Sequence, residues 1–306
     1  MDTIEATLAE KPTSISPEEW KVRVDLAACY RLLAHFGWDD LILTHNSARV
    51  PGTTDQILIN PMGLMFNEIT SSNLLKVDLD GNLIEPSEYQ PIYAGIVIHG
   101  AIYHARPDVQ CVIHTHTEAD IAVGALKEGL LPLHVLGEHR LGQAVARVGL
   151  LAKGAGPAAG GVDQDPVGAL EEGLLPLSQW AMRFYNRLGY HDYEGVSLDL
   201  DERERLQRSI GNHQVLVLRN HGLLATGRDV AEAFSLTYHF ERSAEAQLKI
   251  QAAVASGAKM VVPAPDTCER QAALFSGNGE MARLAGQREW PALLRLADRL
   301  DPSYRN

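Results

Sequence analysis

The chain has 306 residues, of which 45% are apolar and only 6% aromatic, so it can bury a sizeable core built mainly of aliphatic side chains. Its formal net charge is -12, from 39 acidic and 27 basic residues without an evident basic stripe, which argues against nucleic acid as a partner. Three widely spaced cysteines, no basic leader and no long apolar run favour a cytoplasmic protein without a membrane span.

A polar segment, residues 1–15, precedes the first predicted helix and is expected to be mobile. Ser16 and Glu19 have the spacing of a capping box, in which the glutamate side chain reaches back to the N–H of the cap residue. Pro17 suits the first helical position because its missing N–H would be unpaired there anyway. The pattern predicts a helix that ends near Phe36.

Short aliphatic runs then predict strands, and a further helix follows them. An Asp-Gly pair after the third run is typical of a hairpin turn. The predicted strands cover residues 41–43, 56–59 and 74–79, and the helix covers residues 92–105.

A strand beginning near residue 109 carries the first chemically distinctive motif. His114 and His116 are two residues apart, so both imidazoles project from the same face of the strand. Two adjacent imidazoles are half of a metal site, although an isolated pair of this kind is more often accidental. Thr117 is predicted to cap a helix with acidic residues, including Glu118, in its first turn.

A second aliphatic run, residues 213–227, is also typical of a strand and contains Asn220-His221-Gly222. Three neutral imidazoles with an open fourth position are the usual donor set of a catalytic zinc, which polarises an oxygen held at that position. The two runs together indicate one site.

With these motifs the chain resembles the class II aldolase and adducin family, which includes fuculose-phosphate and rhamnulose-phosphate aldolases. The resemblance covers roughly residues 20–260 and rests on residues 44–47, 59–63, 106–116 and 218–224. It implies an α/β fold, a three-layer α/β/α domain with a central, largely antiparallel mixed sheet. It also implies that His114, His116 and His221 bind a divalent metal, zinc or else manganese or iron.

Three positions depart from the family pattern. In the sugar-phosphate aldolases a glutamate on the helix before the H-x-H strand acts as acid and base, and serines before it hold the substrate phosphate. Here Gly95 stands at the glutamate position, and Tyr93 and Ala94 stand at the serine positions. Because glycine cannot transfer a proton, sugar-phosphate cleavage is not the expected reaction.

Other side chains could supply the missing acid or base. The candidates are Glu118, which follows the second histidine closely, and His99 and Tyr103 on the preceding helix. Each has a structural alternative, since Glu118 also suits a helix N-terminus and His99 could be a core or metal-supporting imidazole.

The resemblance places a further set of residues on the substrate side of the site. Asn46 and Ser47 match a family loop that follows the first strand, and Gly63 belongs to the next matching motif. Asn46 and Ser47 would serve equally well to cap a turn.

An internal repeat interrupts the domain. The segment 123–133 recurs as residues 167–177 with one substitution, Lys127 against Glu171. The Gly-, Ala- and Pro-rich material between the copies predicts an insertion at about residues 134–166. His116 and His221 are 105 residues apart, and subtracting the 44-residue offset between the two copies leaves 61, which is close to the separation expected in relatives.

The second half of the chain is predicted to be mainly helical outside the second motif. Helices are expected at residues 178–188, 199–206 and 229–255. A domain spanning residues 16–262 would then be followed by a helical tail, residues 263–306.

Three functions from different classes fit these observations. The favoured one is a metal-dependent aldolase-like lyase acting on a small, non-phosphorylated carbonyl or carboxylate substrate. The alternatives are a non-catalytic adducin-like assembly module that retains the metal site, and a metal-dependent isomerase or oxygenase on the same fold. The resemblance further implies a homo-oligomer, with a tetramer favoured.

Overall fold

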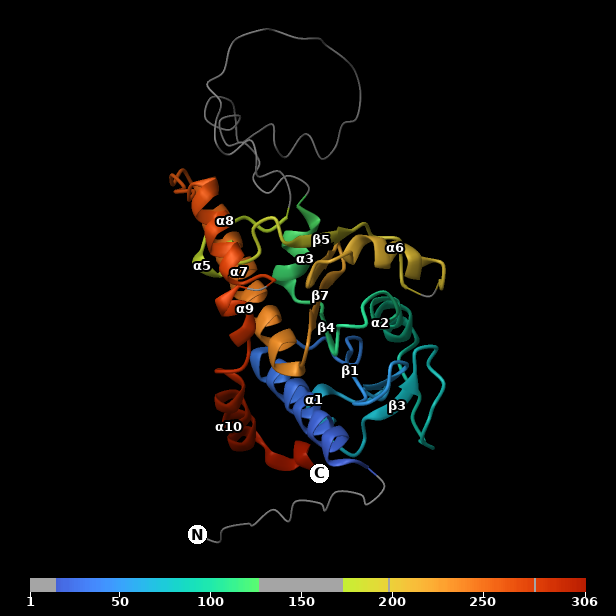
Figure 1. Cartoon of the computed structure of the whole chain (residues 1–306). Helices are drawn as coiled ribbons and strands as arrows, with labels where there is room; N and C mark the ends of the chain where they lie inside the picture. The colour runs from blue at the N-terminus through green and yellow to red at the C-terminus, as the bar shows by residue number, and fades with distance from the viewer. Residues whose placement is uncertain (1–14, 127–172, 198, 278) are drawn as a thin grey trace, which may run out of the picture.

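The computed structural model describes residues 15–126, 173–197, 199–277 and 279–306 (Figure 1). A seven-stranded sheet forms its centre, with the strand order β3-β2-β1-β4-β7-β6-β5. Every neighbouring pair is antiparallel except β5 and β6, which confirms the predicted, largely antiparallel mixed sheet. The strands are β1 (Asn46–Arg49), β2 (Gln56–Ile59), β3 (Leu75–Asp78), β4 (Cys111–Thr115), β5 (Leu188–His191), β6 (Val215–Leu218) and β7 (Gly222–Gly227).

Helices cover both faces of this sheet and complete the predicted three layers (Figure 1). Alternation along β4 divides the core, because Cys111 and Ile113 pack on the side of α1 and α7 whereas Val112 packs on the side of α2 and α6. The first side carries α1 (Pro17–Phe36), α3 (Glu118–Ala125) and α7 (Val230–Ala255), and the second carries α2 (Tyr93–Ala105) and α6 (Glu202–Ile210).

The start of α1 follows the capping prediction in part. The Oγ of Ser16 accepts a hydrogen bond from the backbone N of Glu19 at 3.0 Å, as predicted. The reciprocal half of the capping box is wrong, because the Glu19 carboxylate instead accepts hydrogen bonds from buried Arg23 and from Lys76. A buried guanidinium beside the helix therefore competes successfully for the carboxylate.

The strand predicted at residues 41–43 is wrong. Leu41 and Leu43 lie in a turn and are 64% and 57% exposed. The true strand is β1, just after them, which is polar and yet fully buried. Several of its polar groups are hydrogen-bonded to side chains from distant parts of the chain, including Tyr30, and these bonds offset the cost of burying the strand.

Two predictions in the second half also need correction. The helix expected at residues 178–188 is only α5 (Gln179–Met182), and β5 begins where that helix was expected to end. The run at residues 213–227 is not one strand but the hairpin of β6 and β7, which turns at Asn220 with φ 57°. An aliphatic run does not show by itself where the chain reverses.

The C-terminal residues pack against α1. Trp290 donates a hydrogen bond from Nε1 to the Asp25 carboxylate at 2.9 Å, and Ser71 N donates to the carbonyl of buried Tyr304 at 2.8 Å. The elements here are α8 (Pro265–Leu274), α9 (Glu280–Leu284), α10 (Trp290–Leu300) and the 3-10 turn η4 (Pro302–Arg305).

Some predicted features lie outside the described residues, namely the N-terminal mobile segment up to residue 14, the insertion at residues 134–166, and most of both repeat copies. Among the residues that are described, no helix combines the length and the apolar character needed to cross a bilayer.

Candidate metal centre

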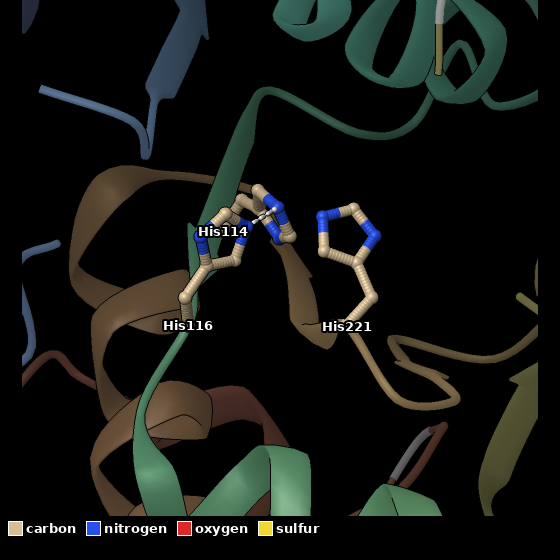
Figure 2. A group of neighbouring side chains, drawn as sticks. All are labelled: His114, His116 and His221. Atoms are coloured by element: carbon tan, nitrogen blue, oxygen red, sulfur yellow. Dashed lines mark hydrogen bonds between the residues drawn. The ribbon is translucent and has the colours of Figure 1, made fainter. Parts of the chain in front are cut away.

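Three histidines meet where β4 ends and β7 begins (Figure 2). His114, His116 and His221 can each offer one ring nitrogen, and these atoms all lie within 4.8 Å of one another. His114 is fully buried, whereas the other two are partly exposed. Among the described residues, the cluster is therefore open to solvent at His116 and His221.

The Asn-His-Gly motif places its histidine through backbone geometry. Asn220 adopts a left-handed conformation with φ 57°, which asparagine tolerates better than most residues. A Cβ at Gly222 would lie 2.1 Å from the carbonyl oxygen of Thr115, so only glycine allows β7 to approach β4 here. The pairing of Thr115 with Leu223 then sets His221 beside the H-x-H pair.

Hydrogen bonds at Nδ1 fix the tautomers of two of these rings. His114 Nδ1 lies 2.7 Å from the carbonyl oxygen of Leu223, and His116 Nδ1 lies 3.0 Å from Oδ2 of Asp40. A carbonyl or a carboxylate oxygen only accepts, so each Nδ1 carries the proton. Both Nε2 atoms therefore present lone pairs, as in metal-binding histidines that are oriented by a carboxylate or a carbonyl.

This donor set fits a divalent metal. The Nε2 atoms of His114 and His116 lie 2.8 Å apart, and two facing lone pairs repel unless a cation lies near both. Burial lowers the pKa of His114 well below its usual range, and burial, with His116 nearby, lowers the pKa of His221 to about 4. Protonation of His114 and His221 is thus disfavoured. The nitrogens of a tetrahedral zinc site would be only slightly farther apart than the two Nε2 atoms are here, at about 3.3 Å.

A buried pair of acids holds the chain on both sides of His116. Thr115 Oγ1 lies 2.8 Å from Asp120 Oδ2 and 3.0 Å from Glu241 Oε1, and Thr117 Oγ1 donates to the other Glu241 oxygen at 2.7 Å. Burial raises the pKa of Asp120 well above its usual range and that of Glu241 to about 7. We infer that one of the two carboxyl groups is protonated at neutral pH.

His45 is the residue of this region that sequence analysis missed. A Cβ at Gly95 would lie 2.9 Å from His45 Cγ, so the imidazole fills the space beside the position of the family glutamate. The His45 ring centroid is 4.9 Å from that of His114, and burial lowers its pKa well below the usual range. Its place inside the matched segment 44–47 was the only available signal.

Four predicted site residues are brought together behind the metal centre. Ser47 Oγ lies 2.6 Å from His99 Nδ1 and 3.0 Å from the Tyr103 hydroxyl, and all three side chains are buried. Asn46 Oδ1 accepts a hydrogen bond from the backbone N of His114 at 3.0 Å. Asn46 and Ser47 thus lie in β1 rather than in the loop expected after the first strand.

The remaining two predicted site residues lie apart. Glu118 is exposed in the first turn of α3, and Gly63 is exposed in a turn with φ 96°. Within the described part of the chain, neither makes a hydrogen bond or ion pair to the three histidines.

A mixed sheet between two helical layers, with three histidines supplied by H-x-H and N-H-G motifs, defines a domain of the class II aldolase type. The chain belongs to the class II aldolase and adducin family: the family model described as Class II Aldolase and Adducin N-terminal domain matches residues 24–159 and 166–248.

Individual relatives agree with this assignment. An aldolase II superfamily protein from Pseudomonas syringae is 40% identical, with a TM-score of 0.74 and coverage of 95% of this chain and 98% of its own. Rat alpha-adducin is 32% identical over 91% of this chain, but the match spans only 33% of the adducin. The L-fuculose 1-phosphate aldolase from Glaciozyma antarctica PI12 shares the fold, with a TM-score of 0.71, 20% identity and 97% coverage of both chains.

Proposed function

We propose that the protein is a metal-dependent lyase that breaks a carbon–carbon bond, by aldol cleavage or decarboxylation, in a small carbonyl or carboxylate substrate without a phosphate. The observation that carries the proposal is the convergence of His114, His116 and His221, two of them with fixed tautomers and facing Nε2 atoms. Membership of the class II aldolase and adducin family supports the class of reaction.

Zinc suits three imidazole ligands, with manganese or iron as alternatives. When bound, the ion would supply a Lewis acid that polarises the substrate oxygen and stabilises negative charge developing on it. The chain's own contribution would be to hold the three rings, through Leu223 and Asp40, so that little reorganisation is needed.

The positions that hold phosphate and transfer protons in sugar-phosphate aldolases argue for a different substrate. Gly95 has no ionisable group, and the ring of His45 occupies the space beside it. Tyr93, at a position where the resemblance predicts serine, is 48% exposed and too bulky to form a small phosphate cradle. A substrate without a phosphate fits this site better.

Glu118, His99 and Tyr103 remain proposals for the acid–base groups. Glu118 is exposed and follows His116 by two residues in the chain. His99 and Tyr103 are buried and reach the metal centre only through other side chains, so they would act by positioning those side chains.

The substrate-side residues also remain proposals. Asn46 and Ser47 would contribute indirectly, because their side-chain oxygens already bond His114 and His99. Gly63 is exposed and would offer only its backbone.

We further propose that the protein is a homo-oligomer, with a tetramer favoured. Exposed apolar side chains lie at the mouth of the site: Leu41 and Leu43 follow Asp40, and Tyr193 lies with its ring 6.2 Å from that of His221. A second subunit would cover such groups. Light scattering at micromolar concentration should show more than one chain per particle, and a monomer would contradict this part of the proposal.

The similarity to alpha-adducin favours a second candidate, a binding or assembly module that has kept the metal site without chemistry. Both candidates bind a metal ion at the three histidines. They differ in activity, because the metal-loaded lyase would cleave a small oxo or hydroxy acid and the module would not.

Metal analysis tests the lyase proposal. Protein prepared without chelators should carry close to one divalent ion per chain, and His114→Ala or His221→Ala should abolish it, while His104→Ala, at an exposed position, should not. Zinc-, manganese- or iron-loaded protein should then cleave a member of a panel of small oxo and hydroxy acids, but not fuculose 1-phosphate or rhamnulose 1-phosphate. A metal-free wild type would end the lyase proposal and favour the module.

A further inference from the structure

A buried chain of four side chains runs from the interior to the metal centre: Tyr103, Ser47, His99 and His45. The Tyr103 hydroxyl lies 3.0 Å from Ser47 Oγ, which lies 2.6 Å from His99 Nδ1. His99 Nε2 lies 3.0 Å from His45 Nδ1. Each of the four is at most 2% exposed, so water cannot replace these hydrogen bonds.

The direction of the hydrogen bonds follows from counting protons. If Ser47 donated to Tyr103, the phenolic proton would have no acceptor among the described residues. The satisfied arrangement has Tyr103 donating to Ser47 and Ser47 donating to His99 Nδ1. Burial lowers the pKa of His99 to about 3, so its ring is neutral and carries its one proton on Nε2.

That proton determines the tautomer of His45. His99 Nε2–H donates to His45 Nδ1, which must therefore be the acceptor nitrogen of a neutral ring. The remaining proton of His45 is on Nε2. Each residue of the chain thus fixes the hydrogen position of the next one.

The position of the His45 ring leaves its Nε2–H available as a hydrogen-bond donor. The His45 atoms that crowd Gly95 are Cγ, Cδ2 and Nδ1, so Nε2 lies on the far edge of the ring. Within the described residues Nε2 has no hydrogen-bond partner, and the ring lies 4.9 Å from that of His114. A hydrogen-bond donor is therefore left over beside the metal centre.

We propose that His45, with its tautomer fixed by His99, Ser47 and Tyr103, donates a hydrogen bond from Nε2–H to an oxygen of the substrate held at the metal centre. It lies beside Gly95, the position at which the resemblance to sugar-phosphate aldolases implies a glutamate. This inference rests on the proposed function. It replaces a group that accepts a proton with an imidazole that donates a hydrogen bond in a fixed direction.

A hydrogen-bond donor at His45 Nε2 favours decarboxylation over aldol cleavage, the two reactions of the proposed function. Aldol cleavage must first remove the proton of a substrate hydroxyl group. His45 cannot accept that proton, because its Nε2 already carries a hydrogen and its Nδ1 already accepts a hydrogen bond from His99. Decarboxylation of an acid with a carbonyl β to the carboxylate needs no such base. The bond to the carboxylate carbon breaks, its electron pair passes through the enolate to the carbonyl oxygen, CO₂ leaves, and the carbon later takes a proton from water. A donor aimed at that oxygen stabilises the developing charge.

Nitrogen NMR on histidine-labelled, metal-free protein tests the tautomer directly. We expect the His45 signals, assigned by their loss in His45→Gln, to show a protonated Nε2 and an unprotonated Nδ1. Ser47→Ala should convert them to a mixture of tautomers, which a merely structural role of Ser47 would not do. A wild-type His45 protonated on Nδ1 would overturn the proposal whether or not the protein binds metal.

Binding of oxalate, a planar mimic of an enolate next to a carboxylate, tests the donor. Calorimetry on zinc-loaded protein should show binding weakened by about tenfold or more in His45→Leu at unchanged zinc content, in line with the loss of a hydrogen bond to a charged group. His45→Gln, which keeps an N–H near the position of Nε2, should bind more tightly than His45→Leu, and the exposed control His104→Gln should match the wild type.

The outcomes separate this inference from the proposed function. Equal oxalate affinity in the wild type and His45→Leu would overturn the donor role while leaving the metal site intact. Wild-type protein that takes up no zinc would remove the lyase proposal, and the NMR result would still decide the tautomer. If His45→Leu does not fold, Ser47→Ala replaces it, because loss of the Ser47 hydroxyl releases the tautomer of His45; wild-type oxalate affinity in Ser47→Ala would then count against the proposal.

Discussion

His45 and Gly95 are complementary in shape, since a Cβ at position 95 would approach His45 Cγ to 2.9 Å. Gly95→Ala should therefore destabilise the protein, because the cost of overpacking, about 1–3 kcal/mol, exceeds the helix-propensity gain of about 1 kcal/mol in α2. In a His45→Ala background the same change should become stabilising, because the collision is gone. Urea denaturation of the four proteins measures this reversal of sign; destabilisation by the same amount in both backgrounds would refute the packing account.

Gly222→Ala should remove the metal site. The added Cβ would lie 2.1 Å from the Thr115 carbonyl oxygen and 3.1 Å from His116 Cδ2, so β7 must move away from β4 and take His221 with it. Zinc affinity should fall by at least about a hundredfold when one of three ligands is displaced. Gly257→Ala is the matched control: its φ of 96° brings backbone strain without a nearby atom, and zinc binding should be unchanged.

The stability of the metal-free protein should depend on pH through Asp120 and Glu241. Burial raises the folded-state pKa of Glu241 from 4.5 to about 7, so the folded state holds a proton that the unfolded state has already released. The stabilisation is complete below about pH 4.5 and is lost as the pH rises to about 7. Glu241→Gln should flatten this part of the profile, measured as the free energy of unfolding in urea, because it removes the titrating group. A profile as steep as that of the wild type would show that Glu241 is not the titrating group.

Deleting residues 123–166 should give a folded, metal-binding protein. Val167-Gly-Ala-Leu would then replace the identical residues at the end of α3. The described residues stop at Leu126 and resume at Gly173, and Arg219 contacts the first of these places directly and the second through Tyr190. Nη1 of Arg219 is 3.5 Å from the carbonyl oxygen of Leu126. Cζ of Arg219 is 4.8 Å from the ring of Tyr190, whose hydroxyl accepts a hydrogen bond from Leu174 N at 3.3 Å. Both ends of the shortened connection thus contact the same pair of side chains, Arg219 and Tyr190.

The deletion variant should melt at an equal or higher temperature and bind the same amount of zinc. An insoluble or metal-free variant would mean that the insert belongs to the core or to the site. In that case His134 and His139, which lie outside the described residues, would need to be considered as functional residues.

The ligands of the candidate site can be predicted from sequence because local backbone chemistry marks them. His114 and His116 share a strand face, and Asn220 and Gly222 are residue types that a tight turn and a close strand approach require. The helix caps are local as well, which is why Thr117 is predicted correctly as the cap of α3. Short-range rules account for these parts of the molecule.

What sequence reasoning misses depends on partners far along the chain. Polar β1 does not look like a central strand until Tyr30 and His114 are seen to satisfy it. Asp40 orients His116 from 76 residues away, and His45 gains its importance only beside Gly95. Such contacts leave no periodic signal in the sequence, because each depends on tertiary packing rather than on spacing.

The arrangement of the ligands on β4 and at the start of β7 has a mechanical consequence for folding. An ion held by His116 and His221 would cross-link two segments that are neighbours in the sheet but 105 residues apart in the chain. The histidines come together only on folding, so the ion would bind the folded chain alone and add its binding free energy to the stability of the fold. Sequence added between the two strands would leave this link intact as long as β4 and β7 stay paired.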